Sequence, residues 1–474
     1  MERMISSVKH TFFVLLGVVL FIFYRGASPN QSKLLVIGIL SAPDHFELRE
    51  AARKTWIQNI GSDALYYFLI GKHMCPVPLE DRIDEFSCKE SAVFFPAGNG
   101  VLLQSGNVTC YGENMDVPIY PSYSFTVEHD IVIQRLGILN EFSKQTVRVN
   151  LIEAATGLKL TSATFSPDKT SNFSSILWKP VERYRLPKGF EGRITLETNA
   201  HSRDWQSNCG FNWNASGNVL AYHLVWSSQG QIVRNFQNSL SAVVVGFELA
   251  DSDNLTTFLR QKSQRKNQWA KQIEFINQKL YEESSRSHDI LYLDVVDVYR
   301  LLPKKMLNFY KWADQNIYFS YLLKTDDDTY INIPEVMKEL HSQSTKNREL
   351  PDQIWWWSAF RQGWPVQLSG KWREGSYHSV TYPPFPCGAG YVLSHGAVNF
   401  LSKIADTLYT KFQGEDAALG IWLAGTNPQS TLNRTACFWT CDSSQDKYSC
   451  NYPQLSVQQM LQTHQQIQSN FIDQ

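Results

Sequence analysis

Residues 322–330 carry the sequence LLKTDDDTY, in which an apolar run leads directly into three consecutive carboxylates. A continuous apolar run is typical of a strand buried on both faces, and open α/β sheets hold their ligands at the carboxyl ends of their strands. Adjacent carboxylates repel one another unless a cation shares them, and Mg²⁺ or Mn²⁺ prefers oxygen ligands. The stretch therefore predicts an α/β sheet with a metal–diphosphate site at its edge. A solvated acidic turn is the alternative.

Other apolar runs supply the neighbouring strands of this sheet. Lys33–Ala42 and Leu65–Ile70 flank a segment whose D-x-x-E sequence, Asp44 to Glu47, predicts a helix start, so residues 33–74 are typical of a βαβ unit. The same pattern returns after residue 260, with strands predicted at 289–296 and 317–323. We therefore expect one split α/β domain.

Residues 75–259 have a different character. Short alternating runs, such as 146–151 and 192–197, are separated by Gly, Pro, Asn and Ser, which predicts an all-β sandwich inserted into the α/β domain. A carbohydrate- or protein-binding module and a structural decoration fit this pattern equally. The sequence therefore predicts a split α/β domain at residues 33–74 and 260–450. The inserted β-rich domain is predicted at 75–259 and a C-terminal tail at 451–474.

The N-terminus predicts the compartment. Thr11–Tyr24 is an uncharged apolar run between Lys9 and Arg25. As a helix it would span roughly 21 Å, less than the roughly 30 Å of a bilayer core, so it is either a cleaved signal peptide or a short anchor helped by snorkelling flanks. We favour the anchor, with residues 1–10 cytosolic and 25–32 a short stem. Both readings place the remainder of the chain in the lumen or outside the cell.

Glycosylation sequons and cysteines agree with an oxidising compartment. The eight cysteines suit disulfides, whose pairing the sequence leaves open, and a zinc site among the last three is less favoured because no C-x-x-C pair or nearby His accompanies them. The 474-residue chain has a formal net charge of −1, which excludes an overall basic footprint for nucleic acid. The sequons are at Asn30, Asn107, Asn172, Asn214, Asn254 and Asn433.

Three further stretches are candidates for ligand contact. Glu415-Asp416 precedes small and apolar residues typical of a buried helix, whose N-terminus would keep a carboxylate base ionised, although acidic residues also serve as caps there. Gly388-x-Gly390 ends a Pro-rich aromatic loop and would let a ligand approach the backbone. The run 355–357, WWW, would either stack on a sugar or fill the core; we favour core for at least two of the three.

Taken in order, these motifs resemble the β1,3-glycosyltransferases of family 31. The resemblance rests on residues 49–56 (RxxxRxTW), 68–71 (FLIG), 324–328 (KTDDD), 382–391 (YP with GxGY) and 415–416 (ED). It implies a GT-A-type fold, type II topology in Golgi or endoplasmic reticulum membranes, and metal-dependent inverting transfer from a UDP-sugar.

The resemblance favours a particular reaction. This is transfer of GalNAc from UDP-GalNAc to GlcNAc-terminated glycans, including O-mannosyl chains, in a β1,3 linkage. A Gal or GlcNAc donor is the rival within enzymes. A lectin-like or chaperone relative without turnover is the rival outside them.

The same resemblance implies roles for single residues. Asp328 would bind Mn²⁺ or Mg²⁺, Asp326 and Asp327 would orient the nucleotide-sugar, and Asp416 would be the general base. Ser41 and the glycines at 388 and 390 would lie along the nucleotide. Two arginines of the first helix would either reach the nucleotide or form surface salt bridges: Arg49 and Arg53.

One departure concerns the metal. Many family members carry a His downstream of the base carboxylate that completes the metal site. That position lies near Cys441 here, and the only His further downstream is His464. Metal binding would then rest on Asp328, water and diphosphate.

Overall fold

The fold is known from a computed structural model, which describes residues 32–91, 93, 103–111, 117–167, 176–198, 209–213, 216–227, 229–234, 236, 239–430, 437–442 and 449–472. The predicted anchor and four of the sequons, at residues 30, 172, 214 and 433, lie outside these ranges. Within these ranges, no helix is both long and apolar enough to cross a membrane.

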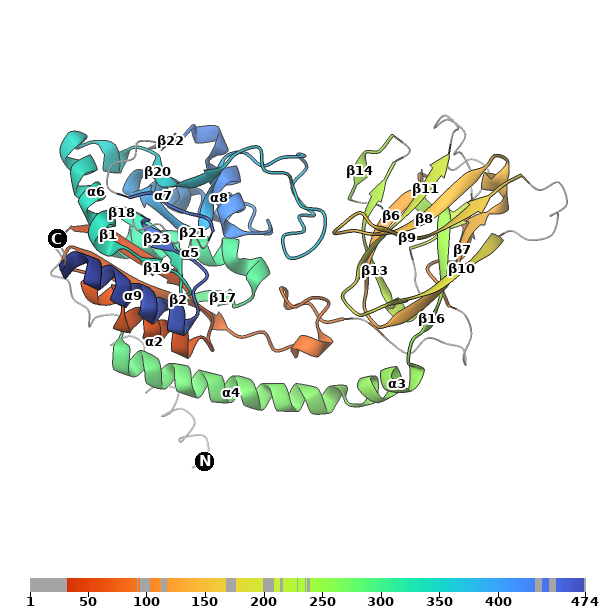
Figure 1. Cartoon of the computed structure of the whole chain (residues 1–474), viewed down its shortest axis with the longest axis horizontal. Helices are drawn as coiled ribbons and strands as arrows, with labels where there is room; N and C mark the ends of the chain where they lie inside the picture. Colours follow the sequence, from red (N-terminus) through yellow and green to blue (C-terminus); the bar gives the residue numbers. More distant parts are fainter. Residues whose placement is uncertain are drawn as a thin grey trace, which may run out of the picture.

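The predicted α/β sheet is present and has seven strands in the order β17-β2-β1-β18-β21-β20-β22 (Figure 1). The neighbours β17/β2, β2/β1 and β1/β18 are parallel, whereas β21 runs antiparallel to β18 and β20. Four parallel strands therefore end at one edge. The bounds are β1 Lys33–Leu40, β2 Ala64–His73, β17 Ile290–Val296, β18 Phe319–Asp326, β20 Trp355–Arg361, β21 Phe385–Ser394 and β22 Gln429–Ser430.

Helices cover both faces of this sheet. Buried apolar side chains of α2, α6 and α9 pack in one cluster, and those of α5, α7 and α8 pack in another on the opposite face. The predicted helix starts within the D-x-x-E stretch, at Phe46, but its N-cap is His45 and no side chain caps it. The helices are α2 Phe46–Lys54, α3 Ser252–Arg260, α4 Lys262–Ser287, α5 Leu302–Asn316, α6 Ile333–Lys346, α7 His395–Ile404, α8 Glu415–Leu423 and α9 Val457–Ile472.

The C-terminal residues are part of the α/β unit, contrary to the predicted tail. β23, Asn451–Tyr452, pairs with β19, Tyr330–Ile331. α9 follows, and its Met460 is fully buried in the core. The segment is rich in Gln, and only a few of its residues face inward. Its composition therefore did not indicate the apolar stripe that packs in the core.

Between β2 and β17, two larger sheets form a sandwich, as predicted. The orders β10-β7-β16-β3 and β14-β13-β6-β11-β8-β9 share one apolar core that includes Phe125, Ile133 and Val245. We call the part from β3 to β16 the β-rich unit. α3 and α4 lead from it back to the α/β unit along one side of both (Figure 1).

The strands of the β-rich unit are short. A third, small sheet has the order β4-β12-β15-β5. The bounds are β3 Leu103–Gln104, β4 Val108–Cys110, β5 Ile119–Tyr120, β6 Ser122–Val127, β7 Ile131–Leu139, β8 Val147–Glu153, β9 Lys159–Phe165, β10 Ile176–Leu186, β11 Glu191–Thr198, β12 Cys209–Phe211, β13 Leu220–Trp226, β14 Ile232–Val233, β15 Leu240–Ser241 and β16 Val243–Leu249.

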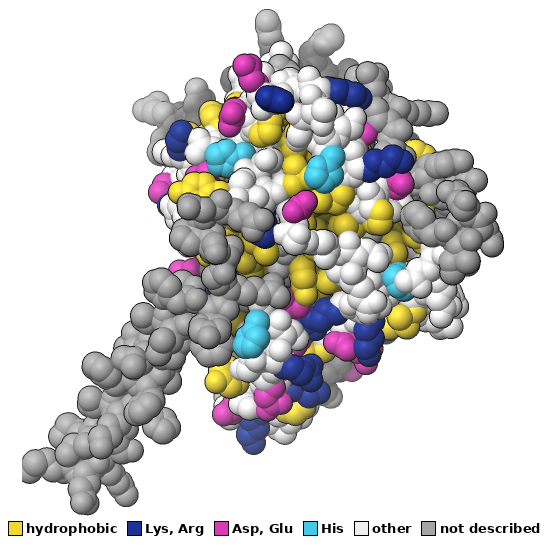
Figure 2. All heavy atoms as spheres, turned by 90° about the vertical axis from the view of Figure 1, so that its left-hand side faces the viewer, with side chains coloured by type: hydrophobic (Ala, Val, Ile, Leu, Met, Phe, Trp, Pro, Cys, Tyr) yellow, Lys and Arg dark blue, Asp and Glu magenta, His cyan; other side chains and the backbone are white. Residues whose placement is uncertain are grey.

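All eight cysteines form disulfides, as an oxidising compartment predicts. This excludes the zinc alternative, because no thiolate is left among them to bind a metal. The pairs are Cys75–Cys88, Cys110–Cys209, Cys387–Cys441 and Cys437–Cys450. On the face of the α/β unit shown in Figure 2, Lys and Arg intermingle with Asp and Glu, in agreement with the balanced composition.

Candidate active site

The aspartate triplet lies at the end of β18, beside the end of β1. The backbone N–H of Asp327 donates to the carbonyl of Leu40 at 3.0 Å. His45, which follows β1, places Nδ1 2.9 Å from Asp327 Oδ2. The pKa of His45 is raised chiefly by this hydrogen bond. The turn is thus held on the carboxyl edge of the sheet, where the sequence predicts a ligand.

Lys324 joins the triplet to the second acidic motif. Its side chain is buried, and its Nζ lies 2.8 Å from Asp326 Oδ1 and 2.6 Å from Glu415 Oε1. The same ammonium donates to the carbonyl of Gly388. One buried cation therefore brings β18, β21 and the start of α8 to a single place. Two motifs almost ninety residues apart in the sequence become one site.

Asp416 occupies the first turn of α8. Its Oδ1 accepts from the backbone N–H of Ala417 at 2.8 Å. Burial, and next the neighbouring carboxylate of Glu415, raise the pKa of Asp416 to about 6. A Cβ at Gly388 would lie 3.4 Å from Asp416 Oδ2. The glycine therefore leaves open the space beside this carboxylate that a side chain would fill. A carboxylate with a raised pKa at a sheet edge is suited to accept a proton near neutral pH.

The donor set at the triplet fits a divalent cation held through one carboxylate. Asp326 is paired with Lys324 and Asp327 with His45. Asp328 accepts from the Thr329 hydroxyl at 3.3 Å, and its pKa is raised by burial and then by Asp327. This carboxylate is the least compensated of the three, and Mg²⁺ and Mn²⁺ commonly take few protein oxygens and complete their shell with phosphate and water.

Neither Cys441 nor His464 is free to replace the His that the resemblance implies. The described residues contain no group of three or more His, Cys, Asp or Glu placed to hold a metal. Cys441 is in a disulfide, and His464 places Nδ1 3.1 Å from the Tyr330 hydroxyl and Nε2 2.9 Å from Gln468.

Arg49 has a different position from the one predicted. It is fully buried, so it forms neither a ligand contact nor a surface salt bridge. Its Nε and Nη2 donate to Glu283 at 2.7–3.1 Å, and its remaining N–H groups donate to the Ser41 hydroxyl at 2.8 Å and to the carbonyls of Ala42 and Pro43. All five guanidinium donors are used. Arg49 therefore braces the turn after β1 from behind.

Arg53 and Ser41 are also engaged within the protein. Arg53 donates to both oxygens of Asp289 at 2.8 and 2.9 Å and lies 2.7 Å from Glu283. The Ser41 carbonyl accepts from Lys305 Nζ at 2.9 Å. These residues support the edge that carries His45. Arg53 thus forms salt bridges, the second of its two predicted roles, and nucleotide contact by Ser41 stays a prediction.

The two glycines of β21 also differ from each other. A Cβ at Gly390 would lie 2.4 Å from the Trp439 ring, so this glycine makes room for a packed tryptophan. Gly388, in contrast, borders Asp416. Trp355, Trp356 and Trp357 are all buried in the core, which excludes the sugar-stacking alternative.

Sequence reasoning missed two residues of the site. Lys324 directly precedes the triplet, and its place in an apolar strand beside three carboxylates was a signal for a buried counter-ion. His45 gave no signal, because its contact with Asp327 spans 282 residues.

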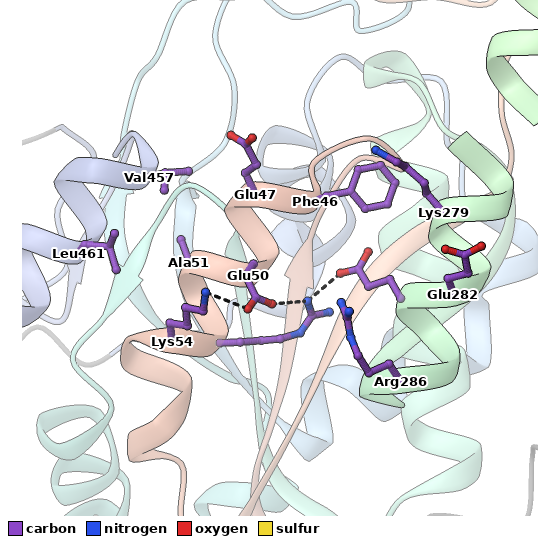
Figure 3. Close-up of a pocket in the computed structure, with 12 residues that line it drawn as sticks. Phe46, Glu47, Glu50, Ala51, Lys54, Lys279, Glu282, Arg286, Val457 and Leu461 are labelled. Carbon is purple, nitrogen blue, oxygen red and sulfur yellow. Dashed lines mark ion pairs between the residues drawn. The ribbon is translucent and has the colours of Figure 1, made fainter. Parts of the chain in front are cut away.

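A separate groove of about 480 Å³ lies on the outer side of α2, between α4 and α9 (Figure 3). Its rim carries charges of both signs, including Glu50, which pairs with Lys54 and Arg53. Neither the triplet nor Asp416 lines this groove.

Two sequence comparisons place the chain in a known group of enzymes. Residues 268–431, which contain the triplet and Asp416, match the Galactosyltransferase family model. The chain is 31% identical to UDP-GalNAc:beta-1,3-N-acetylgalactosaminyltransferase 2 of Xenopus laevis over 471 residues, which cover 94% of this chain and 92% of that protein. The chain belongs to the β1,3-glycosyltransferases of family 31. It is therefore a UDP-sugar-dependent β1,3-glycosyltransferase.

Other members of this family match to different extents. The Homo sapiens protein of the same printed name is 34% identical over 436 residues, 89% of this chain and 85% of its own length. Beta-1,3-galactosyltransferase 6 of Mus musculus is 30% identical over 149 residues, 31% of this chain and 44% of its own length. The first two alignments extend through the β-rich unit, whereas the third is too short to do so in addition to the catalytic motifs.

Proposed function

We propose that this glycosyltransferase transfers GalNAc from UDP-GalNAc to GlcNAc-terminated N- or O-glycans, including O-mannosyl chains, in a β1,3 linkage. The support for the donor is that relatives with this printed activity align over nearly the whole chain, while a galactosyltransferase aligns over about a third of it. The proposal extends to a GT-A-type arrangement of the α/β unit and to a type II protein of Golgi or endoplasmic reticulum membranes. Asn107 and Asn254, both exposed, are its glycosylation sites within the described residues.

The observation that carries the proposal is the meeting of two carboxylate motifs around Lys324. An inverting transfer is a single displacement, in which the acceptor oxygen attacks the anomeric carbon opposite to the departing UDP. Asp416 accepts the proton of the acceptor hydroxyl, the new C–O bond forms, and the bond to UDP breaks with its electron pair leaving on the diphosphate.

The triplet serves the donor side of this reaction. Asp328 would hold Mn²⁺ or Mg²⁺, which when bound neutralises charge on the diphosphate leaving group. Asp327 and Asp326 orient the nucleotide-sugar. Their own partners, His45 and Lys324, fix the two carboxylates so that they need not reorganise when the donor binds.

The test is a donor screen with the detergent-solubilised full-length chain. UDP-GalNAc, UDP-Gal and UDP-GlcNAc are each offered with a GlcNAc-terminated disaccharide, with Mn²⁺ and with EDTA. We expect transfer from UDP-GalNAc that requires metal and gives a β1,3 linkage by NMR. A preference for UDP-Gal or UDP-GlcNAc would replace the proposed donor, and full activity in EDTA would refute the role of Asp328.

A further inference from the structure

The loop at residues 363–384, which joins β20 to β21, contacts both units of the protein. It extends from the α/β sheet toward the β-rich unit (Figure 1). It also carries two exposed tryptophans, Trp364 and Trp372. We call it the 363–384 loop.

The β-rich unit holds this loop through two side chains. Glu191, at the start of β11, accepts from the Gly370 backbone N–H at 2.7 Å and from Arg373 at 2.8 Å. Arg234 donates to the Tyr377 carbonyl at 2.7 Å. Glu191 and Arg373 are both largely buried, with 20% and 15% of their side chains exposed, so their ion pair is shielded from solvent.

The same loop also holds the segment that carries the base. Glu374 is fully buried, and its carboxylate accepts from the backbone N–H groups of Ser376, at 2.5 Å, and Gln413, at 2.8 Å. Tyr382 of the loop packs in one apolar cluster with Ala417 of α8. Asp416 lies between Gln413 and Ala417, so the loop sets the backbone on both sides of the base.

An aromatic surface lies at this end of the site. Trp372 is 56% exposed, and its ring is fixed because Nε1 donates to the Tyr299 hydroxyl at 2.9 Å. The neighbour of that tyrosine, Arg300, donates to the Gln413 side chain. Burial raises the pKa of Tyr299, and the carboxylates of Glu415 and Asp416 raise it further, in keeping with their proximity.

From these contacts we propose that the β-rich unit is part of the acceptor site. Through Glu191 it holds the 363–384 loop where Trp372 stacks on a sugar ring of the acceptor glycan. Trp372 is then an acceptor-binding residue and Glu191 a positioning residue. This inference rests on the proposed glycosyl transfer.

The acceptor is a better occupant of this surface than the donor because of the position of the loop, and its ring chemistry fits the indole. The donor's diphosphate belongs with the triplet, whereas the 363–384 loop bonds to the segment around Asp416, the group that faces the acceptor hydroxyl. A pyranose also presents an apolar C–H face that packs on an indole, while its hydroxyl rim stays in water.

The experiment compares five full-length proteins: the unaltered chain, Trp372→Ala, Glu191→Ala, Glu191→Gln and the control Glu197→Ala. Glu197 lies on the same strand and is exposed to solvent. KM for the GlcNAc disaccharide, KM for the UDP-sugar and hydrolysis of the UDP-sugar without acceptor are measured for each. Hydrogen exchange of the 363–384 loop amides is measured in parallel.

We expect Trp372→Ala and Glu191→Ala to raise the acceptor KM about threefold to tenfold while the donor KM stays the same. Glu191→Ala should also speed hydrogen exchange at the Gly370 amide. Glu191→Gln keeps a carbonyl acceptor, so its acceptor KM and its exchange rate at Gly370 should lie between those of Glu191→Ala and the unaltered chain. Glu197→Ala should match the unaltered chain.

Equal acceptor KM values in Trp372→Ala, Glu191→Ala and the control would overturn the inference, as would equal rises in donor and acceptor KM. A different donor preference of the unaltered chain would refute the proposed donor and leave these comparisons valid with that donor. If the unaltered chain shows no turnover, binding of the disaccharide by saturation-transfer NMR gives the same comparison. Equal binding by Trp372→Ala would then refute the inference.

Discussion

Two clusters of buried charge lie on either side of the first βα turn, and they differ in how completely their charges are paired. In the arginine cluster, Arg49 and Arg53 face the buried Glu283 and Asp289, two cations against two buried carboxylates. The arginines lower the pKa of Glu283 against the effect of its burial. This cluster is balanced and contains its own partners.

The acidic edge is not balanced. Its five carboxylates are those of the triplet and of Glu415-Asp416, and among the described residues their ion-pair partners are Lys324 and the half-exposed His45. Burial raises the pKa of Asp326 to about 7, with Glu415 and Asp328 adding to the rise and Lys324 opposing it. Excess negative charge is costly to bury unless a ligand compensates it. The contrast shows that the degree of pairing, and not the presence of charged residues, separates a functional cluster from a structural one.

The largest effect is expected at the base. Asp416→Asn should lower kcat about a thousandfold, because the amide cannot accept the acceptor proton. Its melting temperature should not fall, since the substitution removes a buried carboxylate with a raised pKa. Asp406→Asn, at an exposed residue paired with Lys311, is the matched control and should keep full activity. Retained turnover in Asp416→Asn would move the base to another residue.

Next in size is the loss of a cation from the balanced cluster. Arg49→Met should destabilise the protein by about 3 kcal/mol, because Glu283 keeps one arginine in place of two in a buried site. Thermal unfolding followed by circular dichroism measures this loss. Arg286→Met, at an exposed position on α4, is the control. An unchanged melting temperature with a raised donor KM would mean that Arg49 contacts the nucleotide, and the contrast between the clusters would fail.

A smaller effect is expected from Asp328→Asn. The amide lacks the charge that the carboxylate offers a divalent cation, so the Mn²⁺ concentration for half-maximal activity should rise about a hundredfold. Activity at saturating Mn²⁺ should recover in part, because diphosphate and water supply the other ligands. Asp352→Asn, at an aspartate that is exposed to solvent, serves as the control. Unaltered metal dependence in Asp328→Asn would place the cation elsewhere.

The sequence predicted the buried strands of the sheet because long apolar runs have few other uses in a soluble domain. It also predicted the β-sandwich from its alternating runs and turn residues. It failed at the C-terminal segment. There α9 is mostly polar in composition, yet it buries one apolar stripe in the core. Helix burial depends on which face meets the core, and composition does not report that.

In the candidate site, too, the sequence predicted the local features and missed the contacts between distant segments. Adjacent carboxylates after an apolar strand were visible because the signal is local. Arg49 and its partner Glu283 are 234 residues apart in the sequence. No local pattern distinguishes such a paired arginine from one that binds a phosphate group. The role of Gly390 was equally hidden, because Trp439 reaches it from a distant segment.

The smallest effect tests the imbalance directly through pH. Burial and Glu415 raise the pKa of Asp416 to about 6, while the Ala417 N–H, Lys324 and Arg361 oppose the rise. The base acts only when ionised, so kcat/KM should be level above pH 7 and fall as the pH drops through about 6. At pH 5 about one-tenth of Asp416 is ionised, which gives about a tenfold loss. An ordinary aspartate would lose little activity there. Glu415→Gln removes a neighbouring negative charge and should move this limb to lower pH, whereas Asp406→Asn should leave it in place. A limb that does not move in Glu415→Gln would show that the carboxylates at this edge do not share their charge as the contrast requires.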